Sequence, residues 1–235
     1  LCYNSEMAEH QLSEFYTPFY AYGSGHDSPN QSRVNMARRI RKEIEGTKEP
    51  QRILGIGAGR GEVEGTLTRD AHGSGNRVWQ SLVRQSQFVT IDIADIPPRK
   101  LVSKRTRTHV RADSRQLPFA TDSFGICTSN LSIDMLRRNE NGDYERTLGE
   151  MRRVLCVGGV ALLSFHASSL FDNLSEVYSG RGGVREQYFD GKSAHNPFYQ
   201  HAEDIAEDLH AVGFKDVAST MVVEGQDEWW ETRAE

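Results

Sequence analysis

The feature that most constrains the fold is an alternation of short apolar runs with helical patterns from Arg52 onward. This order is typical of a parallel sheet with helices on both faces. The expected strands are Ile53–Ile56, Phe88–Ile93, His109–Ala112, Phe124–Ser129, Gly159–Phe165, Val217–Val223 and Glu228–Thr232, and the expected helices lie near residues 61–70, 144–156 and 199–212. Only Glu224–Asp227 separate the last two strands, so they are expected to form an antiparallel hairpin. The predicted fold is therefore α/β, with a doubly wound, mostly parallel, seven-stranded sheet.

Composition narrows the class of protein. The 235 residues are enough for one domain with its own core, and the net charge of −5 argues against a surface that grips phosphates. The longest nearly apolar stretch, Val157–Phe165, is far shorter than the ~20 residues of a membrane-spanning helix. Cys2, Cys127 and Cys156 form no CxxC pair, which argues against disulfides and a zinc site, and Cys127 is expected to be a buried apolar residue. We expect a cytoplasmic protein with no metal, membrane or nucleic-acid partner.

A glycine-rich loop follows the first expected strand. Arg52–Glu62 reads RILGIGAGRGE, with glycine at every second position from 55 to 61. Glycine lets the backbone turn sharply and approach a ligand closely. The loop contains neither the GK[ST] of a phosphate-binding loop nor the GxGxxG of a dinucleotide site. It favours a nucleoside ligand without a pyrophosphate, and the alternative is a tight turn between strand and helix.

Two carboxylates follow the next two expected strands. Asp92 ends the run FVTID, where a carboxylate suits the vicinal hydroxyls of a ribose. A solvated strand end or a helix cap is the alternative interpretation. Asp113 follows the third strand, and its carboxylate can accept a hydrogen bond from an adenine amino group.

Over roughly residues 50–235 the chain resembles the class I S-adenosylmethionine-dependent methyltransferases. The resemblance is carried in order by the glycine loop, the acidic strand end, a "D…LPF…DSF" segment, an "E..RVL..GG" helix and a terminal "aGF" segment; in this chain the last three begin at Asp113, Glu150 and Ala211. It implies the Rossmann-like fold of that family, S-adenosylmethionine as methyl donor and S-adenosylhomocysteine as product. The implied activity is methyl transfer to a small-molecule acceptor, such as a specialised metabolite.

The same resemblance implies roles for individual residues. Gly57 and Gly59, with Gly55 just before them, would lie under the methionine part of the cofactor. Asp92 would hold the ribose, and Ile93 would cover a face of the adenine.

The remaining cofactor contacts implied by the family come from the third and fourth strands. Asp113 would bond the adenine amino group, with the backbone of Ser114 nearby. Asn130 and Leu131 would line the passage to the transferred methyl group.

Three features depart from the family's pattern. Gly55 stands where the family has an acid ahead of the glycine loop, and Gly125 replaces the acid of an "FD" pair on the fourth strand. An insert-like stretch, Gly73–Ser86, lengthens the connection between Gly59 and Asp92. The first two support an alternative hypothesis, a degenerate fold that binds the cofactor but acts as a regulatory protein.

Two residues are candidates for a general base, which an oxygen acceptor would need. Asp134 follows the fourth strand and His166 ends the fifth, in LSFH. The alternatives are a helix N-cap for Asp134 and a hydrogen-bonded strand-end residue for His166.

Two segments are candidates for covering the substrate. Residues 1–50 are predicted to form a helical lid, ahead of a methyltransferase domain at 51–235 in which residues 167–197 are a substrate-side insert. Another hypothesis is a protein or RNA methyltransferase, which would use the basic residues Arg99, Lys100, Lys104, Arg105, Arg107 and Arg111. The oligomeric state is not predicted.

Overall fold

The computed structural model describes residues 31–94, 107–133, 136, 142–167, 199, 201–224 and 227–235. Its strands are β1 (Arg52–Ile56), β2 (Gln87–Asp92), β3 (Arg107–Arg111), β4 (Phe124–Asn130), β5 (Leu155–His166), β6 (Ala218–Glu224) and β7 (Asp227–Ala234). Its helices are α2 (Gln31–Thr47), α3 (Glu62–Gly73), α4 (Arg77–Gln85), α5 (Asp143–Val154) and α8 (Ala202–Ala211).

The strands form one sheet in the order β3-β2-β1-β4-β5-β7-β6. Strands β1 to β5 pair with one another in parallel, whereas β7 is antiparallel to both β5 and β6. The predicted doubly wound sheet and its closing hairpin are therefore confirmed. The fifth strand begins earlier than expected, because Leu155 pairs with Phe124 before the register shifts between Phe124 and Ile126.

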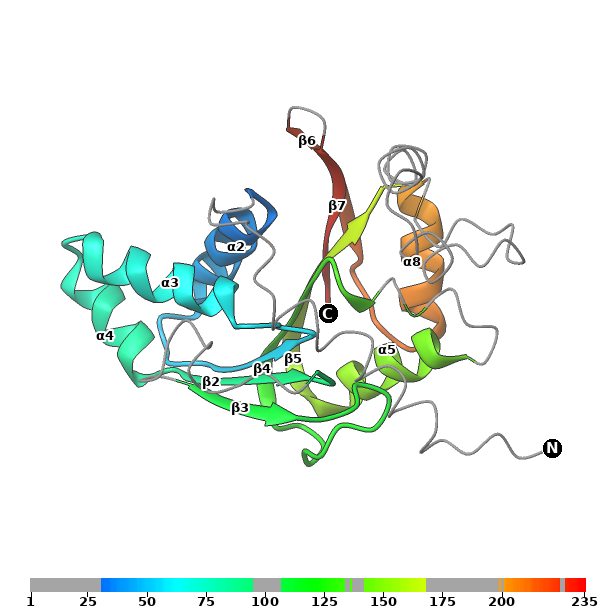
Figure 1. The fold of residues 1–235 in the computed structure, drawn as a ribbon, viewed down its shortest axis with the longest axis horizontal. Coiled ribbons are helices and arrows are strands. Elements are labelled where there is room, and N and C mark those ends of the chain that lie inside the picture. Colours follow the sequence, from blue (N-terminus) through cyan, green and yellow to red (C-terminus); the bar gives the residue numbers. More distant parts are fainter. Residues whose placement is uncertain are drawn as a thin grey trace, which may run out of the picture.

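Helices cover both faces of this sheet. Figure 1 shows α2, α3 and α4 on one side and α5 and α8 on the other. The two buried clusters follow this division, because neighbouring residues along a strand point to opposite faces. On β5, Val160 and Leu162 pack with the α2 side, whereas Ala161 and Leu163 pack with the α5 side.

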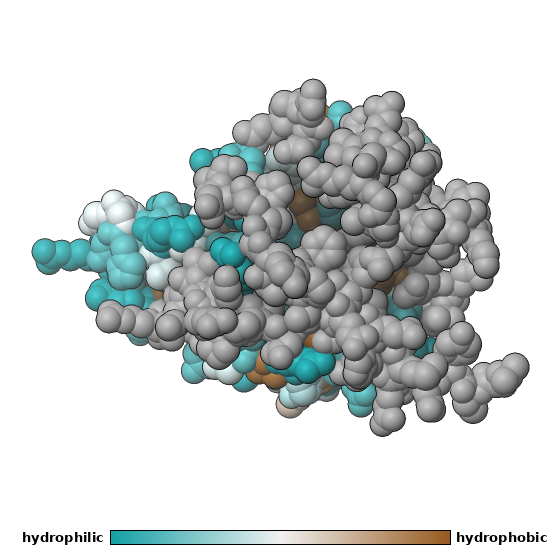
Figure 2. All heavy atoms as spheres, in the orientation of Figure 1, coloured by the Kyte–Doolittle hydropathy of each residue, from teal (hydrophilic) through white to brown (hydrophobic). Residues whose placement is uncertain are grey.

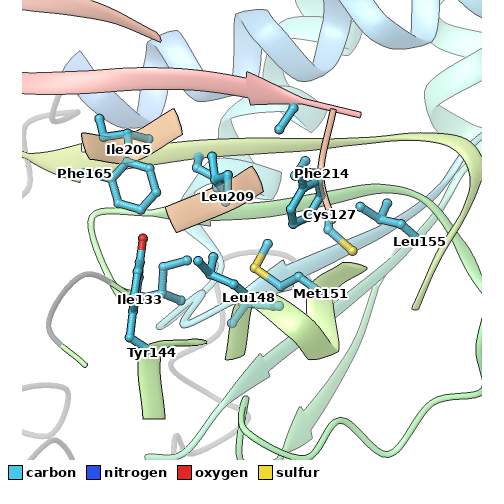
Figure 3. Packing of buried hydrophobic residues seen from close by; sticks show 14 of the residues in the cluster. Cys127, Ile133, Tyr144, Leu148, Met151, Leu155, Phe165, Ile205, Leu209 and Phe214 are labelled. Carbon is cyan, nitrogen blue, oxygen red and sulfur yellow. The ribbon is translucent and has the colours of Figure 1, made fainter. Parts of the chain in front are cut away.

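The core on the α5 side is the larger of the two clusters. Leu148 and Met151 of α5 point toward Leu209 of α8 and toward Cys127 on β4 (Figure 3). Cys127 is fully buried, as the sequence predicts, and burial raises the pKa of its thiol.

Helix α2 is part of the layer that covers the sheet. Its buried side chains include Met36, Ile40 and Ile44, which join the cluster formed with Ile53 of β1. The Arg39 guanidinium donates to the backbone oxygens of β5 and β7, at 2.9 Å to the Leu163 oxygen. Of the predicted lid over residues 1–50, residues 31–47 thus pack on the sheet, and residues 1–30 lie outside the described residues.

The insert-like stretch Gly73–Ser86 contains helix α4. Asn76 caps it by accepting a hydrogen bond from the backbone N–H of Trp79 at 3.1 Å. Trp79, Leu82 and Val83 are buried at a spacing of three and four residues, which is the signature of an amphipathic helix. The surface over α3 and α4 is mostly hydrophilic (Figure 2), so the apolar side of α4 is turned inward.

We predict that Ile40→Ala lowers the free energy of unfolding by about 2–5 kcal/mol, because Ile40 is fully buried between α2 and the sheet. Urea unfolding followed by circular dichroism measures this. Lys42→Ala, at an exposed position of the same helix, is the matched control and should change stability by less than about 0.5 kcal/mol. Equal stability of the two variants would mean that α2 does not belong to the core.

Candidate functional site

The carboxyl ends of the parallel strands meet at one edge of the sheet, where open α/β sheets bind ligands. The loop after β1 has a backbone that only glycine adopts readily. Gly57, Gly59 and Gly61 have φ angles of 59°, 53° and 73°, all in the left-handed region. Gly61 is also the N-cap residue of α3, so the loop runs directly into that helix.

The glycine loop lies close to both neighbouring strands. A Cβ added at Gly57 would overlap the Ser132 hydroxyl, just beyond β4, and lie 2.7 Å from the Ser132 Cβ. Gly59 donates its backbone N–H to Asp92 Oδ2 at 2.8 Å, which joins the loop to the end of β2. The loop therefore lies close against Ser132, just beyond β4, and is hydrogen-bonded to the end of β2.

Asp92 is buried, with 6% of its surface exposed. Its other carboxylate oxygen, Oδ1, accepts the backbone N–H of Ala94 at 2.9 Å. Burial raises the pKa of Asp92, and the hydrogen bonds from Ala94 and Gly59 oppose that rise. A carboxylate offers about four acceptor sites, so Asp92 keeps acceptor capacity for a hydroxyl-bearing ligand. Ile93, the next residue, is half-buried and accepts a hydrogen bond from Arg111 Nε through its backbone oxygen.

Asp113 is held by Arg115, a residue that the sequence interpretation missed. Arg115 donates from Nη2 to Asp113 Oδ2 at 2.6 Å, from Nε to both carboxylate oxygens, and from Nη1 to Asp143 Oδ2 at 3.0 Å. These contacts raise the pKa of Arg115, chiefly through the hydrogen bonds to Asp113. Ser114 turns toward α5, where its hydroxyl lies 3.2 Å from the Thr147 hydroxyl.

The end of β4 carries a polar side chain and an unusual backbone. Asn130 donates from Nδ2 to the Ser32 hydroxyl on α2 at 3.2 Å. Its buried Oδ1 has no hydrogen-bond partner among the residues that the structure describes, so it can accept a bond from a ligand. Leu131 has a φ of 49°, a conformation that is uncommon outside glycine and is often found at functional sites.

Of the two candidate bases, the structure describes one. His166 is the last residue of β5, half-buried, and lies opposite Trp229 of β7. Ser164, two residues earlier on β5, pairs with Asn130 of β4. Because alternate residues of a strand share a face, the side chains of His166 and Asn130 lie on the α2 side of the sheet, at the same edge. Asp134 lies outside the described residues.

Two of the motifs that carry the resemblance, the "E..RVL..GG" helix and the LPF segment, are joined by hydrogen bonds. Glu150 on α5 accepts the backbone N–H of Leu117 at 2.6 Å, and Arg153 donates to the backbone oxygen of Phe119 at 2.8 Å. The pKa of Glu150 is lowered, chiefly by its hydrogen bonds with Arg153. Glu150 and Arg153 thus attach the LPF segment to α5. The LPF segment follows the Asp113 loop, so this attachment helps to position the loop at the end of β3.

Sequence reasoning also missed Glu64, a buried carboxylate in the first turn of α3. The signal was present, because Glu64 shares a helix face with Leu67 and Ala71, which are both buried. Gly125, the other departure from the family's pattern, is the second residue of β4. It lies at the opposite end of that strand from Asn130, beside Gln51, and does not touch this site.

A comparison with protein families decides the assignment. The model of a methyltransferase domain matches residues 30–219, which include α2 and most of the sheet. The chain belongs to the class I S-adenosylmethionine-dependent methyltransferases. The match begins in front of β1, in agreement with the packing of α2 against the sheet.

Among individual members of this family, the chain is similar to the ubiquinone/menaquinone biosynthesis C-methyltransferases of two Vibrio species. It is 27% identical to the protein of Vibrio vulnificus over 141 residues, which make up 60% of this chain and 51% of that protein. For the protein of Vibrio campbellii the identity is 26% over the same shares. The chain thus spans about half the length of the curated relatives it matches.

Solved structures share the fold. The 1,6-didemethyltoxoflavin-N1-methyltransferase of Burkholderia thailandensis, with its substrate and S-adenosylhomocysteine bound, superposes with a TM-score of 0.63 at 15% identity, over 100% of this chain and 90% of that one. The magnesium protoporphyrin IX methyltransferase of Synechocystis PCC 6803 superposes with a TM-score of 0.60 at 13% identity, over 96% and 98%. Within the described residues, no helix has the length and apolar character to cross a membrane.

We predict that Gly57→Ala destabilises the protein by at least about 1–2 kcal/mol, because a Cβ is disfavoured at φ 59° and would displace Ser132. The matched control is Gly73→Ala at the end of α3, where φ is not positive and no atom lies within 4 Å of the added Cβ. That variant should be neutral or slightly more stable. Thermal and urea unfolding of both variants test this, and a Gly57→Ala protein as stable as the control would contradict the loop geometry.

Proposed function

We propose that this chain transfers the methyl group of S-adenosylmethionine to a small-molecule acceptor. The observation that carries the proposal is the junction of two loops at the carboxyl ends of β1 and β2. There, left-handed glycines bring the Gly59 N–H to the buried Asp92 carboxylate at 2.8 Å. This junction offers close backbone approach and a carboxylate with spare acceptor sites, the two features that a nucleoside ligand needs.

The residues present fit the cofactor. Gly55, Gly57 and Gly59 would lie under its methionine part, and Asp92 would accept the two ribose hydroxyls. Ile93 is half-buried beside them and would cover the adenine. Asp92 is fixed by two backbone N–H groups, so it is held in place before the ligand arrives.

Asp113, the expected partner of the adenine amino group, has less acceptor capacity than Asp92. Arg115 already donates to both oxygens of that carboxylate, which leaves little acceptor capacity. We therefore propose that Asp113 and Ser114 shape the adenine edge of the site, and that Asp92 contributes more to affinity. Asn130, through its unpartnered Oδ1, and Leu131 would border the path to the methyl group.

When bound, S-adenosylmethionine supplies an electrophilic methyl group on a sulfonium. Its transfer to an electron pair of the acceptor would break the carbon–sulfur bond and would leave S-adenosylhomocysteine. Positioning alone can contribute about 7–11 kcal/mol to such an in-line displacement. An acceptor that carries a proton must also lose it, and His166 and Asp134 are the proposed bases.

Two observations support a small acceptor. The similar proteins of Vibrio, Burkholderia and Synechocystis are named for small molecules, namely ubiquinone and menaquinone biosynthesis, 1,6-didemethyltoxoflavin and magnesium protoporphyrin IX. The net charge of −5 opposes a polyanionic partner. The alternative, a protein or RNA methyltransferase, depends on basic residues of which Arg99, Lys100, Lys104 and Arg105 lie outside the described residues. The other alternative, a cofactor-binding regulatory protein, shares the binding site and differs only in turnover.

We predict that Asp92→Ala raises the Kd for S-adenosylhomocysteine roughly ten- to hundredfold, because a hydrogen bond to a charged group contributes about 1.5–3 kcal/mol. Isothermal titration calorimetry measures this directly. Asp216→Asn is the control, since Asp216 is exposed and precedes β6, away from the site. Wild-type affinity in Asp92→Ala, or no binding by the wild type, would reject the proposed site.

The pH dependence of that affinity follows from the raised pKa of Asp92. Protonation removes the charge that the hydroxyls prefer, so the affinity should fall as the pH is lowered through that raised pKa, and at higher pH than for an exposed aspartate. Asp92→Asn should bind more weakly at neutral pH and lose this dependence.

We predict that His166→Ala lowers kcat about 10²–10⁴-fold on an oxygen acceptor without changing the Kd for S-adenosylhomocysteine. The measurement is a methyl-transfer assay over a panel of small phenols, quinols and amines, run with calorimetry on the same preparations. His166→Asn separates the roles: it should stay slow if the histidine is a base, and recover much of the rate if the residue only orients the acceptor. A folded alanine variant with wild-type kcat would exclude both roles.

A further inference from the structure

Glu64 is a charged side chain buried beneath the glycine loop. It lies in the first turn of α3 and is 4% exposed. Its neighbour Glu62 behaves as a surface residue, with a side chain 26% exposed and 3.6 Å from both Arg33 and Arg60. The helix dipole favours an acid in the first turn, which accounts for Glu62, but it does not require a carboxylate to be buried.

The position of the Glu64 carboxylate is tied to Gly55. A Cβ added at Gly55 would overlap Glu64 Oε1, and would lie 3.4 Å from Thr90 Cγ2 and 3.5 Å from Ala58 Cβ. Gly55 pairs with Thr90 in the β1–β2 register. The carboxylate therefore occupies the space that a side chain at position 55 would fill, between the end of β1 and the first residues of the glycine loop.

We propose that Glu64 binds the ammonium group of the cofactor's methionine part. Family members carry an acid at the position of Gly55, and in this chain the carboxylate reaches the same place from α3. The inference rests on the proposed function and deepens it, because it names the residue that recognises the amino-acid end of the cofactor. If Glu64 replaces the missing acid, Gly55 no longer supports the hypothesis of a degenerate, regulatory fold.

The chemistry at this place favours an ammonium ligand. S-adenosylmethionine and S-adenosylhomocysteine both carry a primary ammonium, which donates three hydrogen bonds. In a buried, low-dielectric position a charge-assisted bond is stronger than at the surface. The absence of a Cβ at Gly55 leaves the Glu64 carboxylate against the backbone that would underlie the methionine.

Calorimetry with three ligands tests this inference on the full chain. The ligands are S-adenosylhomocysteine, its deaminated analogue, and 5′-methylthioadenosine, which lacks the amino-acid end. Glu64→Gln should raise the Kd for S-adenosylhomocysteine about tenfold or more. The same variant should change the Kd for the other two ligands by less than about twofold. Glu62→Gln is the matched control on the same helical turn and should leave all three values unchanged.

Each other outcome has a definite meaning. If Glu64→Gln binds S-adenosylhomocysteine like the wild type, or weakens all three ligands equally, Glu64 only supports the loop and the inference is wrong. If the wild type binds none of the ligands, the proposed function fails instead. Asp92→Ala gives the contrasting pattern, because loss of the ribose contact should weaken all three ligands.

A relocated carboxylate provides a second test. Glu64→Ala removes the group, and Gly55→Asp together with Glu64→Ala returns it from β1 into the vacated space. We expect Glu64→Ala to lose most of the preference for S-adenosylhomocysteine over its deaminated analogue, and the double variant to recover it at least partly. A double variant that folds like the wild type, by circular dichroism, but shows no recovery would contradict a role tied to this place.

Discussion

The hydrogen bond from the Gly59 N–H to Asp92 Oδ2 connects the loop after β1 to the end of β2 across a sequence separation of 33 residues. It joins Gly59, whose φ is 53°, to the buried Asp92 at the edge of the sheet. The second carboxylate oxygen is fixed by Ala94, so the carboxylate has one orientation. The cofactor site depends on this bond, because it sets both the path of the loop and the direction in which the remaining acceptor sites point.

The packing of the helices explains why this junction is rigid. α3 begins at the loop itself, and α2 packs on α3 and on the sheet beside it. Arg39 extends from α2 to backbone oxygens of β5 and β7, and Arg233 of β7 pairs with Glu43 of α2 at 2.9 Å. The helix in front of β1 therefore links the first strand to the antiparallel hairpin at the end of the chain. On the other face, Glu150 and Arg153 of α5 attach the LPF segment to that helix through hydrogen bonds to its backbone.

The strands and the cofactor-side loops could be predicted from the sequence because their signals are local: period-two apolar runs, spaced glycines, and acids at strand ends. Helix α4 was not predicted, although Trp79, Leu82 and Val83 have helical spacing, because its segment was interpreted only as an insertion relative to the family pattern. Arg115 and Glu64 could not be found by motif, since their roles depend on contacts with Asp113 and with the space beside Gly55. In the sequence, Gly55 looks like the loss of an acidic residue, whereas in the structure the Glu64 carboxylate of α3 occupies the same space.

Hydrogen–deuterium exchange of the full chain, with and without saturating S-adenosylhomocysteine, tests the central claim most directly. Ligand binding should slow exchange of the amides of residues 57–61 and 93–94, which form the junction between the glycine loop and Asp92. The β6–β7 hairpin should exchange at the same rate in both states, because it lies at the far edge of the sheet. Binding without protection of the junction, or with protection confined to the hairpin, would contradict the account.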